Sequence, residues 1–473
     1  MRVLLLKPRP TAVQFGLAPF FQTEPLGLEY IAAALVDKGH LVRILDMRFE
    51  RASVVRLVAR FQPQIVGISC LHILDVSETL AIAKAIKSLT PEIFVAVGGH
   101  AAAAYPAAFS QAQFVDAICA GEGERTMLEL CEAIRHRKPL QDVPSLLLPS
   151  ESGEFVRTIE SKGWLDLSAL LPPDRSHVAK YQRHYCCLNY MPVWTIETTR
   201  GCPHRCTFCS VWQFYKGGCR FHSARNVTAD FENTGRNVFI IDDIFWADKE
   251  RSEEMARGLM ASSERKHWIL AQSRVDLVSE NPELLKLWRP LAKNFDIFFG
   301  FESPTRSGLD ALNKGADVSQ VAAAIETARD LGFGVTGNFI IDPDFTEEDF
   351  AALWDFLETN KLYRVGFTIL TPLPGTRYFE QSKAKLQVFD WNRYDLHHLL
   401  WQPRLPVERF FELYCQTWRR TVLNAAGRKK WWQWLGAVDV RHIGRMARIL
   451  MRTQHIMDPR AYLAETTLPL SGK

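Results

Sequence analysis

Residues 200–209 read Arg200-Gly201-Cys202-Pro203-His204-Arg205-Cys206-Thr207-Phe208-Cys209. The three cysteines have the spacing C-x3-C-x2-C, and they follow an apolar run, Val193–Glu197, that is typical of a β-strand. Three thiolates can each bind one iron of a [4Fe–4S] cubane, which leaves the fourth iron open to a small molecule with an amine and a carboxylate. We therefore predict a catalytic metal cluster held by Cys202, Cys206 and Cys209.

A zinc site and a chance cluster of cysteines are the alternatives. Structural zinc takes four ligands, often in two separated pairs, and the fourth ligand here would be Cys219 or His204. The chain has ten cysteines, and most of the others are scattered, as expected for small buried apolar residues rather than for a disulfide framework.

The chain after the cysteines alternates between strand-like and helix-like periodicity. The strand-like runs are Val193–Glu197, Val238–Ile241, Trp268–Ala271, Ile297–Phe301, Val335–Ile341 and Val365–Leu370. This alternation predicts a partial (β/α)6 barrel, open on one side, over residues 191–385. The active site of such a barrel lies at the carboxyl ends of its strands, which is where the cysteines follow the first strand.

The chain before the cysteines shows a second α/β pattern. Its strand-like runs are Val3–Leu6, Leu41–Leu45, Ile65–Ser69, Ile93–Val97 and Val115–Cys119, with amphipathic stretches between them. They predict a doubly wound parallel sheet in residues 1–140, with a ligand in the crevice beyond the strand ends. No G-x-G-x-x-G follows the first strand, so a dinucleotide is not the expected ligand. Residues 141–190 are predicted to be a linker, and residues 386–473 a helical C-terminal region.

The composition is that of a globular protein. Of 473 residues, 47% are hydrophobic and 23% are charged, and the net charge of +4 is small, so nucleic acid is not an expected partner. No run approaches the roughly 18 apolar residues of a membrane span, and the apolar run near the N-terminus is too short for a signal peptide. We therefore expect a cytoplasmic protein, at most peripheral at the inner membrane.

The longer stretch Glu197–Cys209 resembles the signature of the radical S-adenosylmethionine superfamily. With an α/β domain ahead of it, the chain is similar over about residues 1–385 to the cobalamin-dependent branch of that superfamily. This resemblance implies three cofactors: a [4Fe–4S] cluster, S-adenosyl-L-methionine and cobalamin. It implies that the open iron binds the methionyl amine and carboxylate, and that reductive cleavage yields a 5′-deoxyadenosyl radical. An electron donor such as a flavodoxin or ferredoxin is implied as well.

Polar residues at the next strand ends fit the resemblance. Asp242 and Asp243 end the second strand, where such enzymes bind the methionyl amino group, although two adjacent acids can also cap a helix. Gln272 and Arg274 follow the third strand in a Q-x-R-x-D arrangement that recurs in this branch, and a structural ion pair is the alternative there. These four residues are predicted to bind S-adenosylmethionine.

Glu302 ends the fourth strand, and the resemblance implies that it holds the ribose hydroxyls. The chain departs from the family pattern after the fifth strand, where relatives commonly have a glycine-rich turn and this sequence has Ile341-Asp342-Pro343-Asp344. The usual role of that loop is therefore in doubt for this chain.

Glycines at the strand ends of the first domain are predicted to let cobalamin approach the backbone: Gly98, Gly99, Gly121 and Gly123. The D-x-H-x-x-G motif that supplies a histidine ligand to cobalt is absent, so we expect no protein histidine below the cobalt. His72 and His100 are the alternatives.

Three short stretches, Thr23–Tyr30, Val95–His100 and Ser210–Tyr215, look most like the hopanoid C-3 methylase group. This likeness implies methylation of an unactivated carbon, C-3 of a hopanoid lipid. A cyclase or methyltransferase acting on a tetrapyrrole or another ring is the alternative within the branch. A non-catalytic corrinoid or iron–sulfur sensor is the alternative from another class.

The C-terminal region is rich in arginine and tryptophan. Residues 428–435 read RKKWWQWL, and four arginines follow, interleaved with apolar residues: Arg441, Arg445, Arg448 and Arg452. Basic residues beside tryptophan and leucine are typical of an interfacial helix, which would suit a small-molecule substrate of lipid type. Packing of the tryptophans onto the barrel is the alternative.

Overall fold

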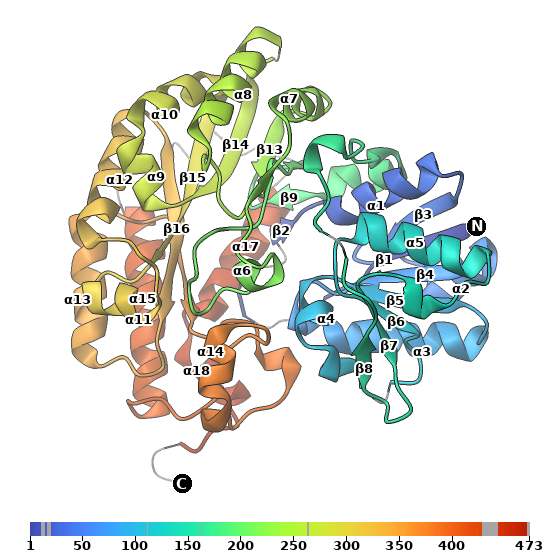
Figure 1. The fold of residues 1–473 in the computed structure, drawn as a ribbon. Helices are drawn as coiled ribbons and strands as arrows, with labels where there is room; N and C mark the ends of the chain where they lie inside the picture. Colours follow the sequence, from blue (N-terminus) through green and yellow to red (C-terminus); the bar gives the residue numbers. More distant parts are fainter. Residues whose placement is uncertain are drawn as a thin grey trace. The chain divides into compact units, whose positions relative to one another are not determined.

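The computed structural model of the chain describes residues 1–10, 15–16, 20–110, 112–161, 163–262, 264–427 and 443–470 (Figure 1). The chain folds into two compact units. Unit 1 comprises Met1–Ala12, Glu24–His184 and Leu373–Gly375, and unit 2 comprises Val13–Thr23, Tyr185–Pro372 and Thr376–Lys473.

Unit 1 is built on a seven-stranded sheet with the strand order β3-β1-β4-β5-β6-β7-β8. Its parallel strands are β1 (Arg2–Lys7), β3 (Leu41–Asp46), β4 (Ile65–Ser69), β5 (Phe94–Gly98) and β6 (Ala117–Cys119). Strand β1 lies inside the sheet, and it is an apolar run because helices cover both of its faces. Val3–Leu6 are at most 1% exposed. These strands confirm the predicted doubly wound sheet.

Helices pack on this sheet in pairs. They are α1 (Leu26–Asp37), α2 (Val54–Phe61), α3 (Val76–Leu89), the short α4 (His100–Ala104) and α5 (Gly123–Arg135). Helix α1 packs beside α5, and α2 packs beside α3, on opposite faces of the sheet (Figure 1).

The segment predicted to be a linker contributes two strands to this sheet. Strands β7 (Leu146–Pro149) and β8 (Phe155–Arg157) form an antiparallel hairpin, and β7 also pairs antiparallel with β6. Leu146 and Leu147 are buried against the sheet, which explains why the hairpin joins the sheet instead of forming an exposed linker. The expectation of a linker over residues 141–190 is therefore wrong for its first part.

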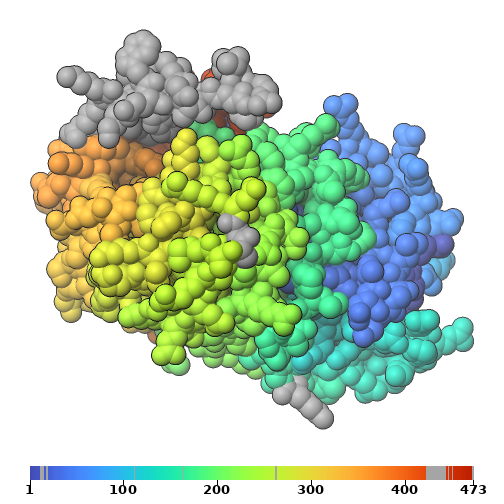
Figure 2. Space-filling model, turned by 90° about the horizontal axis from the view of Figure 1, so that it is seen from above, coloured from blue at the N-terminus to red at the C-terminus, as the bar shows by residue number. Residues whose placement is uncertain are grey.

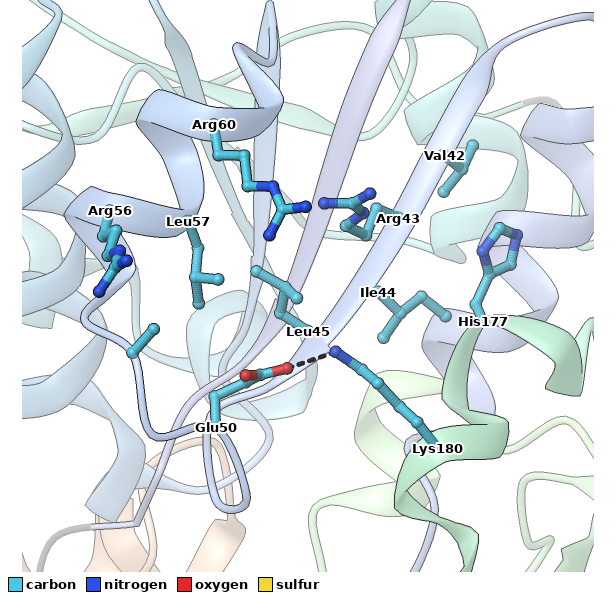
Figure 3. Close-up of a pocket in the computed structure, with 11 residues that line it drawn as sticks. Val42, Arg43, Ile44, Leu45, Glu50, Arg56, Leu57, Arg60, His177 and Lys180 are labelled. Carbon is cyan, nitrogen blue, oxygen red and sulfur yellow. Dashed lines mark hydrogen bonds and ion pairs between the residues drawn. The ribbon is translucent and has the colours of Figure 1, made fainter.

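Strand β3 is an edge of the unit 1 sheet, and a basic cavity of about 750 Å³ lies beside it (Figure 3). Arg43 from β3 and Arg60 from α2 point toward one another there, and Glu50 forms an ion pair with Lys180. Arg43 is an exposed charge on this edge strand, and such a charge opposes pairing with another chain.

Unit 2 is built on six parallel strands in the order β10-β13-β14-β15-β16-β17. They are β10 (Trp194–Ile196), β13 (Asn237–Ile240), β14 (Lys266–Ser273), β15 (Ala292–Glu302), β16 (Gly334–Ile341) and β17 (Val365–Ile369). The end strands β10 and β17 do not pair with each other, so the sheet is a partial barrel. All six predicted strands are present, which confirms the (β/α)6 architecture.

Helices connect successive strands and lie along the outer side of the sheet (Figure 1). They are α7 (Ala224–Glu232), α8 (Lys249–Ser262), α9 (Val275–Glu280), α10 (Pro282–Trp288), α11 (Arg306–Ala311), α12 (Val318–Asp330) and α13 (Glu347–Thr359). Figure 2 shows side chains of this part of the chain, in green and yellow, forming a continuous outer surface.

The C-terminal helices confirm the predicted helical region. Helix α15 (Val407–Gly427) packs against α13 and β17, and α18 (Pro459–Glu465) packs against α15. Residues 428–435 and Arg441 lie outside the described residues. The described helices include none that is both long and apolar enough to span a membrane.

Helix α17 (Ile443–Ile456) is fixed to the rest of unit 2 by Arg445. The Arg445 guanidinium donates to the carbonyl of Leu188 (3.0 Å) and to Sγ of Cys186 (2.7 Å), and it lies over the ring of Phe20. Arg445 thus packs inward, whereas Arg448 and Met451 are exposed.

Candidate active site

The three cysteines lie in one loop that leaves strand β10. The loop is closed at its base by an antiparallel pair, β11 (Thr199–Arg200) with β12 (Arg220–Phe221), and it carries the short helix α6 (Val211–Phe214). The cysteine loop is therefore a closed excursion from the carboxyl end of the first barrel strand, as predicted.

Gly201 sets the sharp turn at the start of this loop. Its φ is +89°, and a Cβ atom there would lie 2.2 Å from the carbonyl oxygen of Gly218. Two backbone segments cross at that point, so only glycine fits.

The three thiols share one environment. Cys206 is buried, and Cys202 and Cys209 are half-buried. Burial raises the pKa of all three thiols, that of Cys209 to about 12, and for Cys209 the neighbouring Cys206 and Cys202 add to the rise. Thiols with raised pKa are neutral until a metal displaces their protons, so binding of a metal cluster releases protons here.

The described residues contain no group of three or more His, Cys, Asp or Glu side chains placed to hold a single metal ion. A cubane does not need such a convergence, because each thiolate binds a different iron. The shared environment of the three thiols therefore fits a cluster with one ligand on each of three irons.

The middle of the cysteine loop is fastened to the turn after helix α11. Thr207 donates its backbone N–H to the Leu312 carbonyl (3.0 Å), and Asn313 donates from Nδ2 to the Arg205 carbonyl (2.7 Å). This turn also carries Lys314, so the loop and the Lys314 turn are held as one piece.

The two adjacent acids after β13 do different things. Asp242 is buried and accepts hydrogen bonds from both backbone N–H groups of Thr198 and Thr199 and from the Thr198 hydroxyl, at 2.5–3.0 Å. Asp243 is exposed, and one of its oxygens accepts a long hydrogen bond from the Gly201 N–H at 3.3 Å. Asp242 thus holds the base of the cysteine loop, and Asp243 has a side chain accessible to a ligand.

Both acids have a raised pKa. Burial raises the pKa of Asp242 to about 6, against the opposing effect of the Thr198 hydrogen bonds. Loss of hydration also raises the pKa of Asp243 to about 7, although its side chain is exposed, and the charges of Asp242 and Glu197 add to the rise. An acid beside other acids in this way favours a cationic ligand such as an ammonium group.

Glu197 and His222 form a second layer behind the loop. Oε1 of Glu197 accepts from Nε of Arg200 (2.6 Å) and lies 3.1 Å from Nε2 of His222. Burial alone would raise the pKa of Glu197, but Arg200 and His222 bring it below its ordinary value. Arg251 donates to the Thr198 carbonyl (2.9 Å), which ties helix α8 to the same layer. Sequence reasoning did not identify this layer.

Glu302 ends strand β15 in an unusual conformation. Its φ is +59°, its side chain is buried, and the register of β15 against β16 shifts at this point. The carboxylate accepts a hydrogen bond from Nζ of Lys314 at 2.6 Å. Lys314 was not among the predicted residues, and the only sequence signal for it is its place in the turn Asn313-Lys314-Gly315.

Arg274 and Gln272 lie at the end of β14. The guanidinium of Arg274 forms a bidentate ion pair with Asp276, and it also donates to the carbonyls of Lys314 (3.0 Å) and Gly315 (3.2 Å). Arg274 therefore positions the Lys314 turn. Gln272 is half-buried at the same strand end. Binding of a cofactor by either residue stays a prediction.

The predicted cobalamin glycines lie, half-exposed, at the carboxyl edge of the unit 1 sheet. An added Cβ would lie 2.5 Å from the Cys70 carbonyl oxygen at Gly99, 2.8 Å from Ser145 at Gly121 and 2.5 Å from Ile31 at Gly123. Packing within the protein is thus sufficient reason for these three glycines. At Gly98 the nearest atom would be 3.4 Å away, an ordinary contact, so an approaching ligand remains the distinctive explanation there.

Comparison with known proteins identifies two matching domains. Residues 17–131 match the B12 binding domain, and residues 196–357 match the radical SAM superfamily. The chain belongs to the cobalamin-dependent radical S-adenosylmethionine enzymes. Its cofactors are a [4Fe–4S] cluster, S-adenosylmethionine and cobalamin.

Curated relatives of this radical S-adenosylmethionine enzyme match along most of its length. The hopanoid C-3 methylase of Methylococcus capsulatus is 29% identical over 99% of this chain and 90% of the relative. The anaerobic magnesium-protoporphyrin IX monomethyl ester cyclase of Rubrivivax gelatinosus is 25% identical over 90% of this chain and 78% of the relative.

Two solved structures have a fold similar to that of this chain. The methyltransferase TsrM from Kitasatospora setae, with cobalamin and a [4Fe–4S] cluster bound, has a TM-score of 0.68 at 18% identity and covers 85% of this chain and 82% of its own. The enzyme OxsB has a TM-score of 0.71 at 17% identity and covers 96% of this chain and 71% of its own.

Proposed function

We propose that this cobalamin-dependent radical S-adenosylmethionine methyltransferase adds a methyl group to C-3 of a hopanoid lipid. The observation that carries the proposal is the end-to-end similarity to the hopanoid C-3 methylase, which includes the C-terminal helical region beyond the radical domain. A region outside the shared catalytic domain is where enzymes of one family differ in substrate, so similarity that extends through it favours a similar substrate.

The cofactors supply the difficult chemistry when they are bound: the cluster an electron, S-adenosylmethionine the radical and the methyl group, and cobalamin the methyl carrier. The residues of the chain bind and orient. Cys202, Cys206 and Cys209 hold the cluster, and Asp243 is accessible to accept the methionyl ammonium. Glu302, at the end of β15, accepts the ribose hydroxyls.

A cyclase or methyltransferase acting on a tetrapyrrole or another ring substrate is the second candidate function. It is favoured by the cyclase of Rubrivivax gelatinosus and by the bacteriochlorophyllide d C-12(1)-methyltransferase of Chlorobaculum tepidum, which is 26% identical over 59% of this chain and 61% of the relative. The match to the bacteriochlorophyllide methyltransferase leaves much of this chain uncovered. It therefore supports a tetrapyrrole substrate less strongly than the match to the cyclase does.

The test is anaerobic reconstitution of the full chain with iron, sulfide and cobalamin, followed by incubation with reductant, hopanoid and methyl-labelled S-adenosylmethionine. We expect labelled 3-methylhopanoid and 5′-deoxyadenosine. Deoxyadenosine with label only in an added tetrapyrrole would favour the second candidate. Label in neither would contradict methyl transfer to both, and absence of deoxyadenosine would favour a sensor. A Cys206→Ala variant is the control for cluster-independent product.

We also propose a reduced flavodoxin or ferredoxin as the electron donor. The support is chemical, because a cluster of this kind needs a low-potential one-electron reductant. Replacing a chemical reductant by each purified protein in the same assay tests it, and product formed with neither would contradict it.

A further inference from the structure

Lys314 and Glu302 form a buried ion pair beside the cysteine loop. Nζ of Lys314 lies 2.6 Å from Oε1 of Glu302, and the two side chains are only 9% and 8% exposed. Burying two charges is costly unless their partners are held in place. We therefore expect the residues around the pair to hold both side chains in place.

The Lys314 turn is held from three sides. Helix α11 accepts the Lys314 backbone N–H through the Leu309 carbonyl (3.0 Å), and Arg274 donates to the carbonyls of Lys314 and Gly315. On the third side the turn bonds to the cysteine loop through Asn313 and the Arg205 carbonyl. Lys314 is thus fixed relative to both the cluster loop and Glu302.

Only one oxygen of the Glu302 carboxylate has a hydrogen-bond partner among the described residues. Oε1 accepts from Lys314, whereas no hydrogen bond to Oε2 is found within the part of the chain that the structure describes. Oε2 is also not among the fully buried polar atoms without a partner, so it has access to a ligand. Lys314 holds one oxygen and leaves the other free to accept a hydroxyl.

Gly300 leaves room for this pair. A Cβ at Gly300 would lie 2.3 Å from Oε1 of Glu302 and 2.8 Å from Nζ of Lys314. The positive φ of Glu302 turns its side chain back over Gly300, and the strand has no side chain in the way. The sequence Gly300-Phe301-Glu302 therefore serves the ion pair as well as the strand.

We propose that Lys314 is a positioning residue of the S-adenosylmethionine site, which holds Oε1 of Glu302 so that Oε2 is oriented for the ribose. The inference rests on the radical S-adenosylmethionine chemistry of the site and on the proposed ribose contact of Glu302. It does not depend on which substrate is methylated.

The test compares Lys314→Met and Lys314→Arg with the wild-type full chain after anaerobic reconstitution. Two quantities are measured: iron content, and the affinity for S-adenosylmethionine by equilibrium dialysis. Lys286→Met is the matched control, since Lys286 forms an exposed ion pair with Glu283 at 2.5 Å in the same unit.

We expect Lys314→Met to keep its iron and to bind S-adenosylmethionine at least about tenfold more weakly, since the charge-assisted hydrogen bond that orients Glu302 is lost. Lys314→Arg should restore most of the affinity, and Lys286→Met should match the wild type. Glu302→Gln, which keeps the shape of the side chain, should weaken cofactor binding without removing Lys314.

Unchanged affinity in Lys314→Met would overturn the proposal. Loss of iron from Lys314→Met, together with normal cofactor affinity in Glu302→Gln, would also overturn it, because Lys314 would then serve only to fold the cysteine loop. Neither outcome depends on hopanoid methylation, so failure of the proposed substrate remains distinguishable.

Discussion

Thr198 donates both its backbone N–H and its hydroxyl to the carboxylate of Asp242, at 2.6 and 2.5 Å. The next residue, Asp243, is exposed and accepts a long hydrogen bond from the Gly201 N–H at 3.3 Å. The two adjacent acids are thus divided between a buried position that holds the base of the cysteine loop and an exposed, accessible one.

Replacing the two acids one at a time should separate these positions. Asp242→Ala leaves three buried donors of Thr198 and Thr199 without an acceptor, at a cost of roughly 1–3 kcal/mol each, so we expect a lower melting temperature and poor iron incorporation. Asp243→Asn should incorporate iron normally and bind S-adenosylmethionine more weakly. Thermal unfolding, iron content and equilibrium dialysis check both variants. Equal loss of stability in the two variants would contradict the division.

Two glycines of the cysteine loop offer a second comparison. Gly201→Ala places a Cβ 2.2 Å from the Gly218 carbonyl, whereas Gly217 has a positive φ of +74° and no atom within 4 Å. Gly217→Ala should cost only about 1–2 kcal/mol of backbone strain and still bind iron. Gly201→Ala should fail to assemble the cluster, as measured by iron content and the charge-transfer absorbance. Normal iron binding by Gly201→Ala would show that the crossing of the two backbone segments is not needed.

The strands were predictable because buried parallel strands are continuous apolar runs. All six strands of the barrel and the five parallel strands of unit 1 stand where the runs Val238–Ile241 or Ile65–Ser69 placed them, to within a few residues. Strands β7 and β8 were missed, since a hairpin at a sheet edge is short and contains Pro149 and Gly153 rather than a long apolar run.

The site was predictable only in part. The spacing of the cysteines identifies the cluster loop, because the ligands lie close together in the sequence. The pairing of Glu302 with Lys314 depends on a left-handed residue and on a turn that Arg274 holds from another strand, and none of these leaves a local pattern. For the same reason the sequence could not tell which acid of the pair at 242–243 is buried and which is exposed.

Membrane contact by the C-terminal region is a further prediction. Removing residues 428–455 is an unsuitable test, because Arg445 of α17 anchors on Cys186 and Leu188 and its loss would disturb unit 2. Reversing the charge of Arg428, Lys429 and Lys430 leaves α17 intact. Each basic residue near an anionic surface contributes about 1 kcal/mol, so this variant should no longer co-sediment with anionic vesicles at 0.1 M salt, an ionic strength at which exposed charges are screened over about 10 Å.

Binding of the wild type to neutral vesicles, and binding of a Lys286→Glu variant to anionic ones, are the controls for this experiment. Equal co-sedimentation of the charge-reversed variant and the wild type would contradict an interfacial role. The tryptophans of residues 431–434 would then be expected to serve packing, the alternative that the sequence leaves open.

The neighbouring glycines Gly98 and Gly99 test the cobalamin site. Gly99 has a φ of +119°, and a Cβ there would lie 2.5 Å from the Cys70 carbonyl oxygen, so Gly99→Ala should destabilise unit 1 with or without cobalamin. A Cβ at Gly98 meets its nearest atom at 3.4 Å, so Gly98→Ala should fold with a normal melting temperature. If cobalamin approaches the backbone at Gly98, that variant should nevertheless bind it more weakly.

The readout is the rise in melting temperature on adding hydroxocobalamin. A ligand that binds only the folded state stabilises it by about 2.7 kcal/mol at a hundred times its dissociation constant, and a weaker ligand stabilises it less at the same concentration. We expect a clear rise for the wild type and a smaller one for Gly98→Ala. An equal rise in the two proteins would place the cofactor elsewhere along the strand ends. Gly98 would then be explained by its packing against Cys119 of β6 alone.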